Sequence, residues 1–299
     1  MSTRDATIAI IAHRDDMFSG QPRLVRLLIP RWEEMGLRVT VVTDPASACE
    51  ADVAFLHVSL SLVPDAYSEL AARFPRTVNG SVRDIRRRAF SRLLVDQEGP
   101  DPGRVIVKTD WNSGGWRELR GEILASTVGR WARPLQPTGR PWRWVSRLEA
   151  ARPWSRRRAL PVDAYPVFPS REAVPEGVWK NPNLVVERFV AEREGPLYVC
   201  RHWLFLGDRE ATRRTVSPDP TVKFRGAMEN TAGRVPEELR RVREELGFDY
   251  GKFDYGIVDG EVVLYDVNRT PGASADARVH AETVAALSEG ILEFLPSRS

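Results

Sequence analysis

The sequence predicts a mixed fold, an α/β domain followed by an α+β region, and three patterns support this fold class. Short apolar, β-branched runs alternate with helical patterns over residues 1–80, which favours a parallel sheet. The turn-rich stretch 99–103 (GPDPG) then marks a boundary. Beyond residue 184, strand-like runs are joined by short turns, which is typical of antiparallel hairpins.

The first domain is expected to contain strands of buried type and helices with one apolar face. Pro64 stands at the first turn of one helix, where its missing N–H leaves no bond unmade. A pattern of helical type also covers 83–95. The expected strands are 7–12, 37–43, 53–58 and 77–78, and the expected helices run from Ser19 or Gly20 to about Met35 and over 64–74 and 83–95.

The remainder of the chain is expected to be rich in strands, with little regular structure between 132 and 182. Gly207–Asp208 and Asp259–Gly260 are hairpin turn signals, and Trp111–Gly115 (WNSGG) has the composition of a flexible loop. The expected strands are 105–107, 184–190, 197–206, 252–258 and 261–267, and the expected helices are 145–151, 236–246 and 281–295.

Composition excludes several classes of protein. With 299 residues, 42% hydrophobic and 28% charged, the chain has ordinary globular composition, so disorder, collagen and coiled coil are excluded. Its two cysteines provide neither a disulfide framework nor a set of cysteine and histidine ligands at metal-site spacing. No apolar run approaches the length of a signal peptide core or a membrane span. We therefore expect a cytoplasmic protein without membrane contact.

Basic residues are concentrated in one segment. Residues 116–158 contain eleven arginines and three glutamates, a net charge of +8 in a chain whose total is only +3. Such a cluster, here the segment 117–158, predicts an anionic partner such as a phosphate, a carboxylate-rich substrate or a nucleic acid. A solvated basic surface explains the same composition equally well.

Three oxygen ligands are expected to meet on the hairpin 252–267. Asp266 and Asn268 are two residues apart and share one face of their strand, and the turn at Asp259–Gly260 folds Asp254 back towards Asp266. Two carboxylates and an amide, with no histidine or cysteine in the set, favour Mg²⁺ or Mn²⁺. The alternative is that these aspartates are surface residues of an ordinary hairpin.

Lys108 is a candidate phosphate ligand. It closes a predicted strand and precedes a loop containing Gly114 and Gly115, whose backbone amides suit contact with phosphate. Neither of the common glycine-rich phosphate-binding motifs, GxxxxGK[ST] and GxGxxG, is present. Together with the candidate magnesium site, Lys108 indicates a nucleoside triphosphate as ligand.

The stretch 252–272 (KFDYGIVDGEVVLYDVNRTPG) resembles the C-terminal core of the ATP-grasp superfamily. The likeness is to its carboxylate–amine ligase branch, which includes D-alanine:D-alanine ligase, glutathione synthetase and ribosomal-protein glutamate ligase. A basic residue precedes a metal-binding Asp by two positions, and an acidic-x-Asn-x-x-Pro-Gly segment follows the turn. By this resemblance Asp254, Asp266 and Asn268 hold Mg²⁺, and Lys252 contacts the transferred phosphate or the oxyanion of the reaction.

The resemblance also implies the remaining site residues. Val105–Gly115 corresponds to the strand, lysine and glycine loop that cover the ATP phosphates, and Leu184–Val190 corresponds to the strand that binds adenine. The implied ATP contacts are Lys108, Gly114 and Gly115 with the phosphates, Arg92 with a phosphate, Glu187 with the adenine amino group, the backbone of Arg188 and Phe189 with the ring edge, and Glu194 with the ribose. Of Arg213, Arg214 and Lys223, one binds phosphate during the reaction, and Arg214 is assigned.

Two features depart from the pattern of the superfamily. Asp266 stands where most relatives have Glu, and 79 residues separate Lys108 from Glu187, more than in the compact ligases. The extra residues contain the basic segment. The expected organisation is an N-terminal Rossmann-like domain (1–98) that precedes a two-lobed ATP-grasp fold, with a small lobe carrying the insertion (99–186) and a larger lobe carrying the metal site (187–299).

The expected function is an ATP- and Mg²⁺-dependent ligase that joins a small-molecule carboxylate to an amine through an acyl phosphate. Two alternatives remain open: a kinase of the same fold that phosphorylates a polyanionic or hydroxyl acceptor, and a non-catalytic protein that binds nucleotide or nucleic acid. His13, His57 and Asn79 follow predicted strands, where open α/β sheets contact ligands, and are weaker candidates for substrate contact. The oligomeric state, the acid and the amine do not follow from the sequence.

Overall fold

The structure is a computed structural model that describes residues 6–16, 22–126, 140–162, 164–221, 227–230, 233–273 and 280–296. Its chain forms two compact units: residues 1–85, 200–215 and 228–299 belong to the first, and 86–199 and 216–227 to the second. These units are not continuous stretches of sequence, and the three-domain division into 1–98, 99–186 and 187–299 stays a prediction. Within the described residues, no helix combines the length and the apolar character needed to cross a bilayer.

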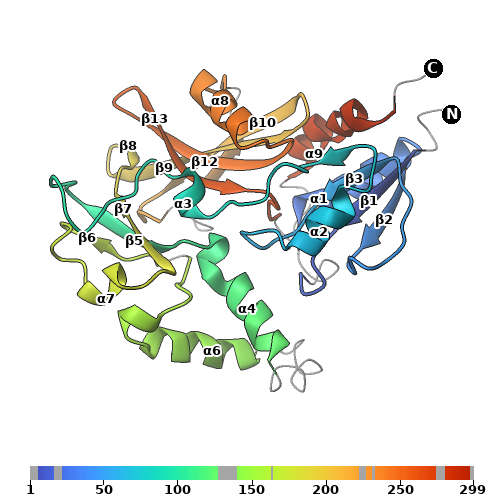
Figure 1. Ribbon diagram of the computed structural model, residues 1–299. Helices are drawn as coiled ribbons and strands as arrows, with labels where there is room; N and C mark the ends of the chain where they lie inside the picture. The colour runs from blue at the N-terminus through green and yellow to red at the C-terminus, as the bar shows by residue number, and fades with distance from the viewer. Residues whose placement is uncertain are drawn as a thin grey trace. The chain divides into compact units, whose positions relative to one another are not determined.

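The first unit begins with a four-stranded parallel sheet in the order β2-β1-β3-β4, which confirms the sheet predicted for this part of the chain (Figure 1). Side chains alternate along a strand, so Ile8 and Ile10 pack with helix α1 while Ala9 and Ile11 pack with helix α2 on the other face. The elements are β1 (Thr7–Ile11), α1 (Leu24–Glu34), β2 (Arg38–Val42), β3 (Val53–Leu56), α2 (Asp65–Ala71) and β4 (Thr77–Val78).

The first unit continues with an antiparallel sheet in the order β11-β10-β9-β12-β13. Its hairpin turns are formed by residues in the left-handed region, with Gly207 at φ 54° and Asp259 and Gly260 at φ 53° and 84°, as their sequences predict. The elements are β9 (Leu197–Leu206), β10 (Arg209–Ser217), β11 (Ala227–Asn230), α8 (Glu237–Glu245), β12 (Tyr250–Val258), β13 (Glu261–Asn268) and α9 (Ala281–Leu287). The helix predicted over 281–295 ends at Leu287 and continues as 3-10 turns over Ser288–Phe294.

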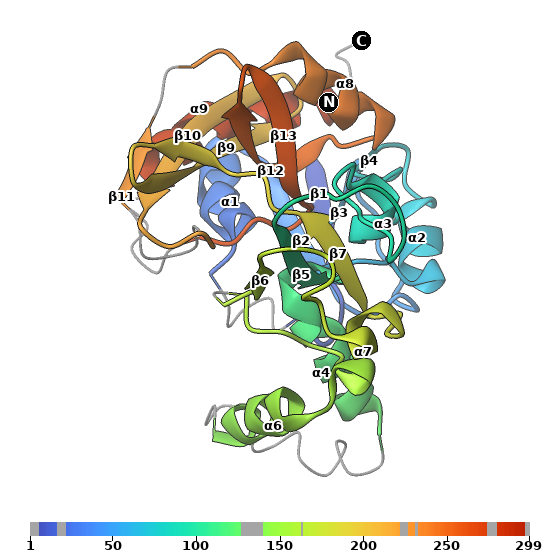
Figure 2. The same cartoon turned by 90° about the vertical axis from the view of Figure 1, so that its left-hand side faces the viewer.

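The second unit is built on a three-stranded antiparallel sheet in the order β6-β5-β7 (Figure 2). A short strand, β8 (Glu192–Glu194), pairs with Leu197–Val199 at the start of β9. Val105, Val107 and Val186 lie in the unit's core. The other elements are α3 (Arg87–Phe90), β5 (Val105–Thr109), α4 (Trp116–Ala125), α6 (Arg140–Ala151), β6 (Val167–Phe168), α7 (Glu176–Trp179) and β7 (Leu184–Arg188).

The helix predicted over 83–95 is wrong except for the single turn of α3. The residues after it run alongside β7, where the N–H of Val95 donates to the carbonyl of Val186 at 2.9 Å and the N–H of Arg188 donates to the carbonyl of Leu93 at 2.8 Å. A short isolated helix is marginally stable in water. Here the hydrogen bonds to a sheet edge outweigh the local helical pattern.

The segment expected to be a flexible loop is instead a tightly packed turn, Asn112–Gly115, followed directly by α4. Gly114 and Gly115 have φ of 67° and 73°. A Cβ atom on Gly114 would lie 2.2 Å from the carbonyl oxygen of Leu160, and one on Gly115 would lie 2.4 Å from that of Arg158. Close approach of the two backbones therefore requires glycine at both positions.

Two buried polar side chains attach the ends of β12 and β13 to the loops of the parallel sheet. The side chain of Asn79 accepts from the backbone N–H groups of Asp249 and Tyr250, both at 2.9 Å. Arg269, which has no exposed surface, donates to the carbonyl oxygens of Val58, Leu60 and Val82 at 3.2, 2.5 and 2.5 Å. These contacts fix the backbone on either side of the hairpin, and neither residue role was predicted from the sequence.

Replacing Arg269 with Met should lower the free energy of unfolding by about 3 kcal/mol, because three buried carbonyl oxygens lose their donor. Urea denaturation measures this change. Arg31→Ala is the matched control, since Arg31 is an exposed residue of α1 whose pairing with Glu34 should contribute less than about 1 kcal/mol. Equal stability of the two variants would contradict the assigned role of Arg269.

Candidate functional site

Four polar residues share one face of the β12–β13 hairpin. Asp254 pairs with Asp266 and Lys252 pairs with Asn268 in the strand register. Residues two apart on a strand, and residues directly opposite on neighbouring antiparallel strands, point to the same face. The convergence of Asp254, Asp266 and Asn268 expected from the sequence is therefore confirmed at the level of register.

A β-bulge produces this register. Between the turn Asp259–Gly260 and Tyr255, the residues of β12 and β13 pair in the register that this two-residue turn sets. Tyr255 therefore pairs with Leu264. The register then shifts, because Asp254 pairs with Asp266 and leaves Tyr265 as an extra residue. Without the bulge Asp254 would pair with Tyr265, and Asp266 would point to the opposite face.

Asp254 is held by two cationic or hydrogen-bonding side chains. Its Oδ1 lies 2.9 Å from Nζ of Lys252 and 2.6 Å from Nδ1 of His202. Burial alone would raise the pKa of Asp254, but Lys252 and His202 outweigh burial and hold this pKa well below its usual range. Burial would lower the pKa of Lys252, and the Asp254 carboxylate outweighs it and raises that pKa. Both groups are therefore charged at neutral pH.

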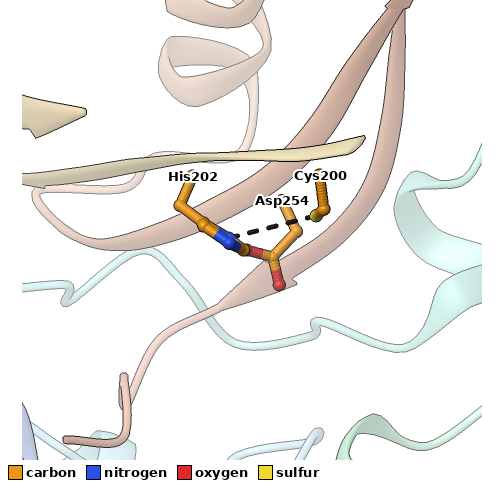
Figure 3. Close-up of side chains that lie close together, drawn as sticks. All are labelled: Cys200, His202 and Asp254. Atoms are coloured by element: carbon orange, nitrogen blue, oxygen red, sulfur yellow. Dashed lines mark hydrogen bonds and ion pairs between the residues drawn. The ribbon is translucent and has the colours of Figure 1, made fainter. Parts of the chain in front are cut away.

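His202 joins the site from the neighbouring strand and was not predicted from the sequence. It pairs with Asp254 in the β9–β12 register, and its Nε2 lies 2.8 Å from the hydroxyl of Thr215 on β10. Cys200, two residues earlier on β9, is buried with its Sγ 4.0 Å from His202 Nδ1 (Figure 3). Alternation along 197–206 places Cys200 and His202 on one face, but the sequence does not reveal which strand lies beside β9.

The oxygen atoms on this face have the chemistry of a magnesium site. Lys252 and His202 both contact Oδ1 of Asp254, and Oδ2 has no partner among the described residues. Oδ1 of Asn268 accepts from the N–H of Thr270 at 2.9 Å, which occupies one of its two lone pairs. With Asp266, the set provides two carboxylates and an amide oxygen, the hard ligands that Mg²⁺ prefers.

In the second unit, Lys108 belongs to a buried charge cluster. Its Nζ lies 2.7 Å from Oε2 of Glu187, and Nη1 of Arg87 lies 3.7 Å from Oε1 of the same carboxylate. Burial alone would raise the pKa of Glu187, but Lys108 and Arg87 outweigh it and lower this pKa. Glu187 thus orients Lys108, while its contact with adenine stays a prediction. No local pattern indicates this role for Arg87, apart from its position in an arginine-rich run.

The backbone and ring of the expected adenine strand have partners within the second unit. The N–H of Arg188 is bonded to Leu93, and the N–H of Phe189 donates to the carbonyl of Arg104 at 2.8 Å. The guanidinium of Arg104 also lies 4.7 Å from the centre of the Phe189 ring. These two N–H groups are therefore committed to the protein, so their expected contact with the adenine ring edge has no support in the geometry.

The other expected ATP contacts lie in different settings within the second unit. Arg92 is exposed beside β7, and Glu194 is exposed at the end of β8, next to the turn at Gly195. Gly114 and Gly115 pack against the backbone of 158–160, and the carbonyl of Gly114 accepts from the N–H of Leu160. Packing alone therefore accounts for both glycines, and their contact with phosphate stays a prediction.

Arg213, rather than Arg214, shares the polar face of the antiparallel sheet. Thr215 contacts His202, so alternation along β10 places Arg213 on that face and Arg214 on the opposite one. Arg213 is buried, with Nη1 3.2 Å from Nδ1 of His280. The reaction role assigned to Arg214 stays a prediction, and Arg213 is the arginine that lies on the face of His202 and Asp254. Lys223 lies outside the described residues.

The weaker substrate candidates make local contacts within the first unit. Asn79 connects β4 to the start of β12, and its side-chain N–H₂ donates to the carbonyl of Tyr250 at 2.8 Å. His57 is buried, with its ring centre 6.3 Å from those of both Phe55 and Tyr250. His13 Nδ1 accepts from the N–H of Asp15 at 3.2 Å. Contact of any of the three with a substrate stays a prediction.

Comparison with known proteins identifies the fold. No family model matches the sequence, and no curated protein is similar enough to match it. Among solved structures, the ATP-grasp ligase PsnB complexed with minimal precursor, Mg and ADP matches with a TM-score of 0.50 and 11% identity over 98% of both chains.

Two further structures give similar values. A RimK domain ATP-grasp protein from Sphaerobacter thermophilus has a TM-score of 0.49 and 14% identity, over 97% of this chain and 99% of that chain. A D-alanine–D-alanine ligase from Bacillus anthracis has a TM-score of 0.47 and 10% identity, over 97% and 95% of the two chains. At such low identity the likeness concerns the fold alone. The chain therefore has the fold of the ATP-grasp ligases, as its hairpin sequence predicts.

Proposed function

We propose that this protein is an ATP- and Mg²⁺-dependent ligase that joins a carboxylate to an amine. The observation that carries the proposal is the register of the hairpin, which brings Lys252, Asp254, Asp266 and Asn268 to one face of the sheet. The ATP-grasp fold supports the choice of ATP as the activating substrate. The parallel sheet of the first unit corresponds, in this proposal, to the Rossmann-like domain that precedes an ATP-grasp.

The magnesium ligands in this proposal are Asp266, Asn268 and the Oδ2 atom of Asp254. Lys252 and His202 leave that oxygen available because both contact Oδ1. A Mg²⁺ ion bound there would neutralise charge on the β- and γ-phosphates. Mn²⁺ would fit the same oxygen ligands.

The proposed reaction has two steps. The substrate carboxylate attacks the γ-phosphorus of ATP, and the bond from phosphorus to the bridging oxygen of ADP breaks to give an acyl phosphate and ADP. The amine then attacks the acyl carbon, inorganic phosphate leaves, and the amine nitrogen loses a proton to give an amide. A kinase would stop after phosphoryl transfer to its acceptor, so dependence on an amine separates the two reactions.

The chain's own residues bind and orient the reactants. Lys252, kept charged by Asp254, is suited to stabilise the negative charge that develops on the transferred phosphoryl group. Arg213 takes the phosphate-binding role on the same face. Lys108, oriented by Glu187, is assigned to the α- and β-phosphates. Binding and charge stabilisation are the main contributions that proteins make to phosphoryl transfer.

The decisive experiment is an assay with Mg²⁺ and ATP and a panel of amino acids and dipeptides as acids and amines. We expect inorganic phosphate to be released only when an acid and an amine are both present, and the product to have the mass of their amide. Mass spectrometry and a phosphate assay measure both quantities. Formation of ADP with a phosphorylated acceptor and no amine requirement would indicate a kinase instead.

Asp266→Asn should lower Mg²⁺-dependent turnover about 100-fold, because the variant keeps the size of the side chain and removes a charged metal ligand. Steady-state kinetics at several Mg²⁺ concentrations measure the loss. Asp259→Asn is the matched control, since Asp259 lies exposed in the turn of the same hairpin and Asn tolerates its positive φ. A similar loss in both variants, or in neither, would remove the metal assignment.

Lys108→Met should weaken ATP binding roughly 10- to 100-fold, because a charge-assisted hydrogen bond contributes about 1.5–3 kcal/mol. Isothermal titration calorimetry with ATP measures the affinity, and thermal unfolding checks that the variant is folded. Lys180→Met serves as control, since Lys180 is an exposed lysine of the same unit. Unchanged ATP affinity in folded Lys108→Met protein would contradict the phosphate role.

A further inference from the structure

Cys200, His202 and Asp254 form a second group of potential metal ligands on the polar face of the antiparallel sheet. The sulfur of Cys200 and the imidazole of His202 are softer ligands than oxygen, and they have no part in the proposed reaction. Cys200 and His202 point to one face of β9, and Asp254 is the residue opposite His202 on β12 (Figure 3). One ligand atom from each of the three residues lies within 4.8 Å of the other two. The group therefore has the compactness of a site with three protein ligands.

The ligand types differ from those preferred by magnesium. A thiolate, an imidazole and a carboxylate together favour Zn²⁺ or Co²⁺, whereas Mg²⁺ takes oxygen ligands. Metal–ligand bonds of about 2.0–2.3 Å place neighbouring ligands of a tetrahedral zinc roughly 3.3–3.7 Å apart. The observed separations are 4.0 Å from Cys200 Sγ to His202 Nδ1 and 2.6 Å from this nitrogen to Asp254 Oδ1. Both separations lie within about 1 Å of this range.

Thr215 provides the outer contact that such a histidine needs. Metal-binding histidines almost always donate their other ring N–H to a fixed acceptor, which selects the tautomer and the ring orientation. His202 presents Nδ1 to Cys200 and Asp254, and its Nε2 lies 2.8 Å from the Thr215 hydroxyl. With the proton on Nε2, the hydroxyl accepts it and Nδ1 is free to bind a metal.

We infer that Cys200, His202 and Asp254 form a binding site for a zinc-type transition metal ion, with the fourth position open to water. On binding, the Cys200 thiol releases its proton to solvent. His202 also gives up the Nδ1 proton that it donates to Asp254, carries its remaining proton on Nε2 and coordinates through Nδ1. This site is distinct from the proposed magnesium site in two of its three ligands. The inference does not depend on the proposed ligase function, because it follows from the positions and chemistry of these side chains.

Lys252 competes with the metal ion for Asp254, and this competition predicts how a Lys252 variant should bind the metal. Its ammonium group lies 2.9 Å from Asp254 Oδ1 and competes with any cation for that carboxylate. Lys252→Met should therefore bind the metal more tightly than the natural protein, by roughly 10-fold or more. The gain supports this site only when the thiolate-to-cobalt band accompanies it, because an ion bound by the oxygen ligands alone would also gain from the loss of Lys252.

The test uses the full-length protein after treatment with a chelator, with Co²⁺ as the spectroscopic probe. We expect one Co²⁺ per chain, a near-ultraviolet charge-transfer band from thiolate to cobalt, and loss of this band when Zn²⁺ is added. Cys200→Ser should abolish the band. Cys49→Ser should retain it, which provides a matched control because Cys49 is the other cysteine of the chain.

Two further variants separate metal binding from other effects. Thr215→Val should weaken Co²⁺ binding about 10-fold, the usual effect of removing an outer-shell partner. Asp266→Asn should retain the thiolate-to-cobalt band while lowering Mg²⁺-dependent turnover, so the failure of one proposal can be distinguished from the failure of the other. Absence of the band in folded natural protein, or its persistence in Cys200→Ser, would overturn the inference.

If Cys200→Ser does not fold, X-ray absorption at the zinc edge of the Cys49→Ser protein decides the question. That protein contains a single cysteine, so one sulfur ligand per zinc identifies Cys200 as the ligand. A coordination shell of nitrogen and oxygen atoms alone would overturn the site.

Discussion

The candidate site depends on a single extra residue in one strand. The bulge at Tyr265 turns Asp266 and Asn268 to the face that already carries Lys252 and Asp254. A change of one residue in strand register moves every following side chain to the other face. Arg269 and Asn79 then hold the ends of the hairpin against the parallel sheet, which keeps this register from slipping. The chemistry of the face is therefore set by backbone geometry as much as by residue type.

Each unit contains a lysine in contact with a buried carboxylate. In both pairs this contact allows two buried groups to remain charged. An unpaired charge in a buried position is strongly destabilising, so each lysine needs a nearby carboxylate to remain charged. Glu187 supports Lys108, with Arg87 adding a second cation, and Asp254 supports Lys252, with His202 adding a second partner. In each case a side chain from a neighbouring strand or turn provides the additional contact, which fixes the orientation of the carboxylate.

Much of the hairpin and its polar face could be predicted from the sequence, and the predictions that were wrong or incomplete have physical causes. The turn Asp259–Gly260 and the alternation around it predict the hairpin, because both are local properties. His202 and Thr215 were missed because strand order in a sheet is not local. The bulge was missed because the turn alone sets a different register. The helix predicted over 83–95 was wrong because hydrogen bonds to β7 outweigh the local helical pattern. The position of Arg213 on the polar face was missed for a similar reason, since the orientation of β10 decides which face Arg213 and Arg214 occupy.

The pairing of Asp254 with Lys252 has an energetic consequence for cation binding. Because Lys252 and His202 already compensate the buried carboxylate, the fold does not require a metal to relieve repulsion between Asp254 and Asp266. Any divalent ion must then compete with a lysine for Asp254, so its affinity for the protein alone is reduced. A triphosphate that arrives with its own metal adds further oxygen ligands and a compensating negative charge for Lys252. In the proposed ligase, the same arrangement would therefore favour binding of a metal–nucleotide complex over binding of the free magnesium ion.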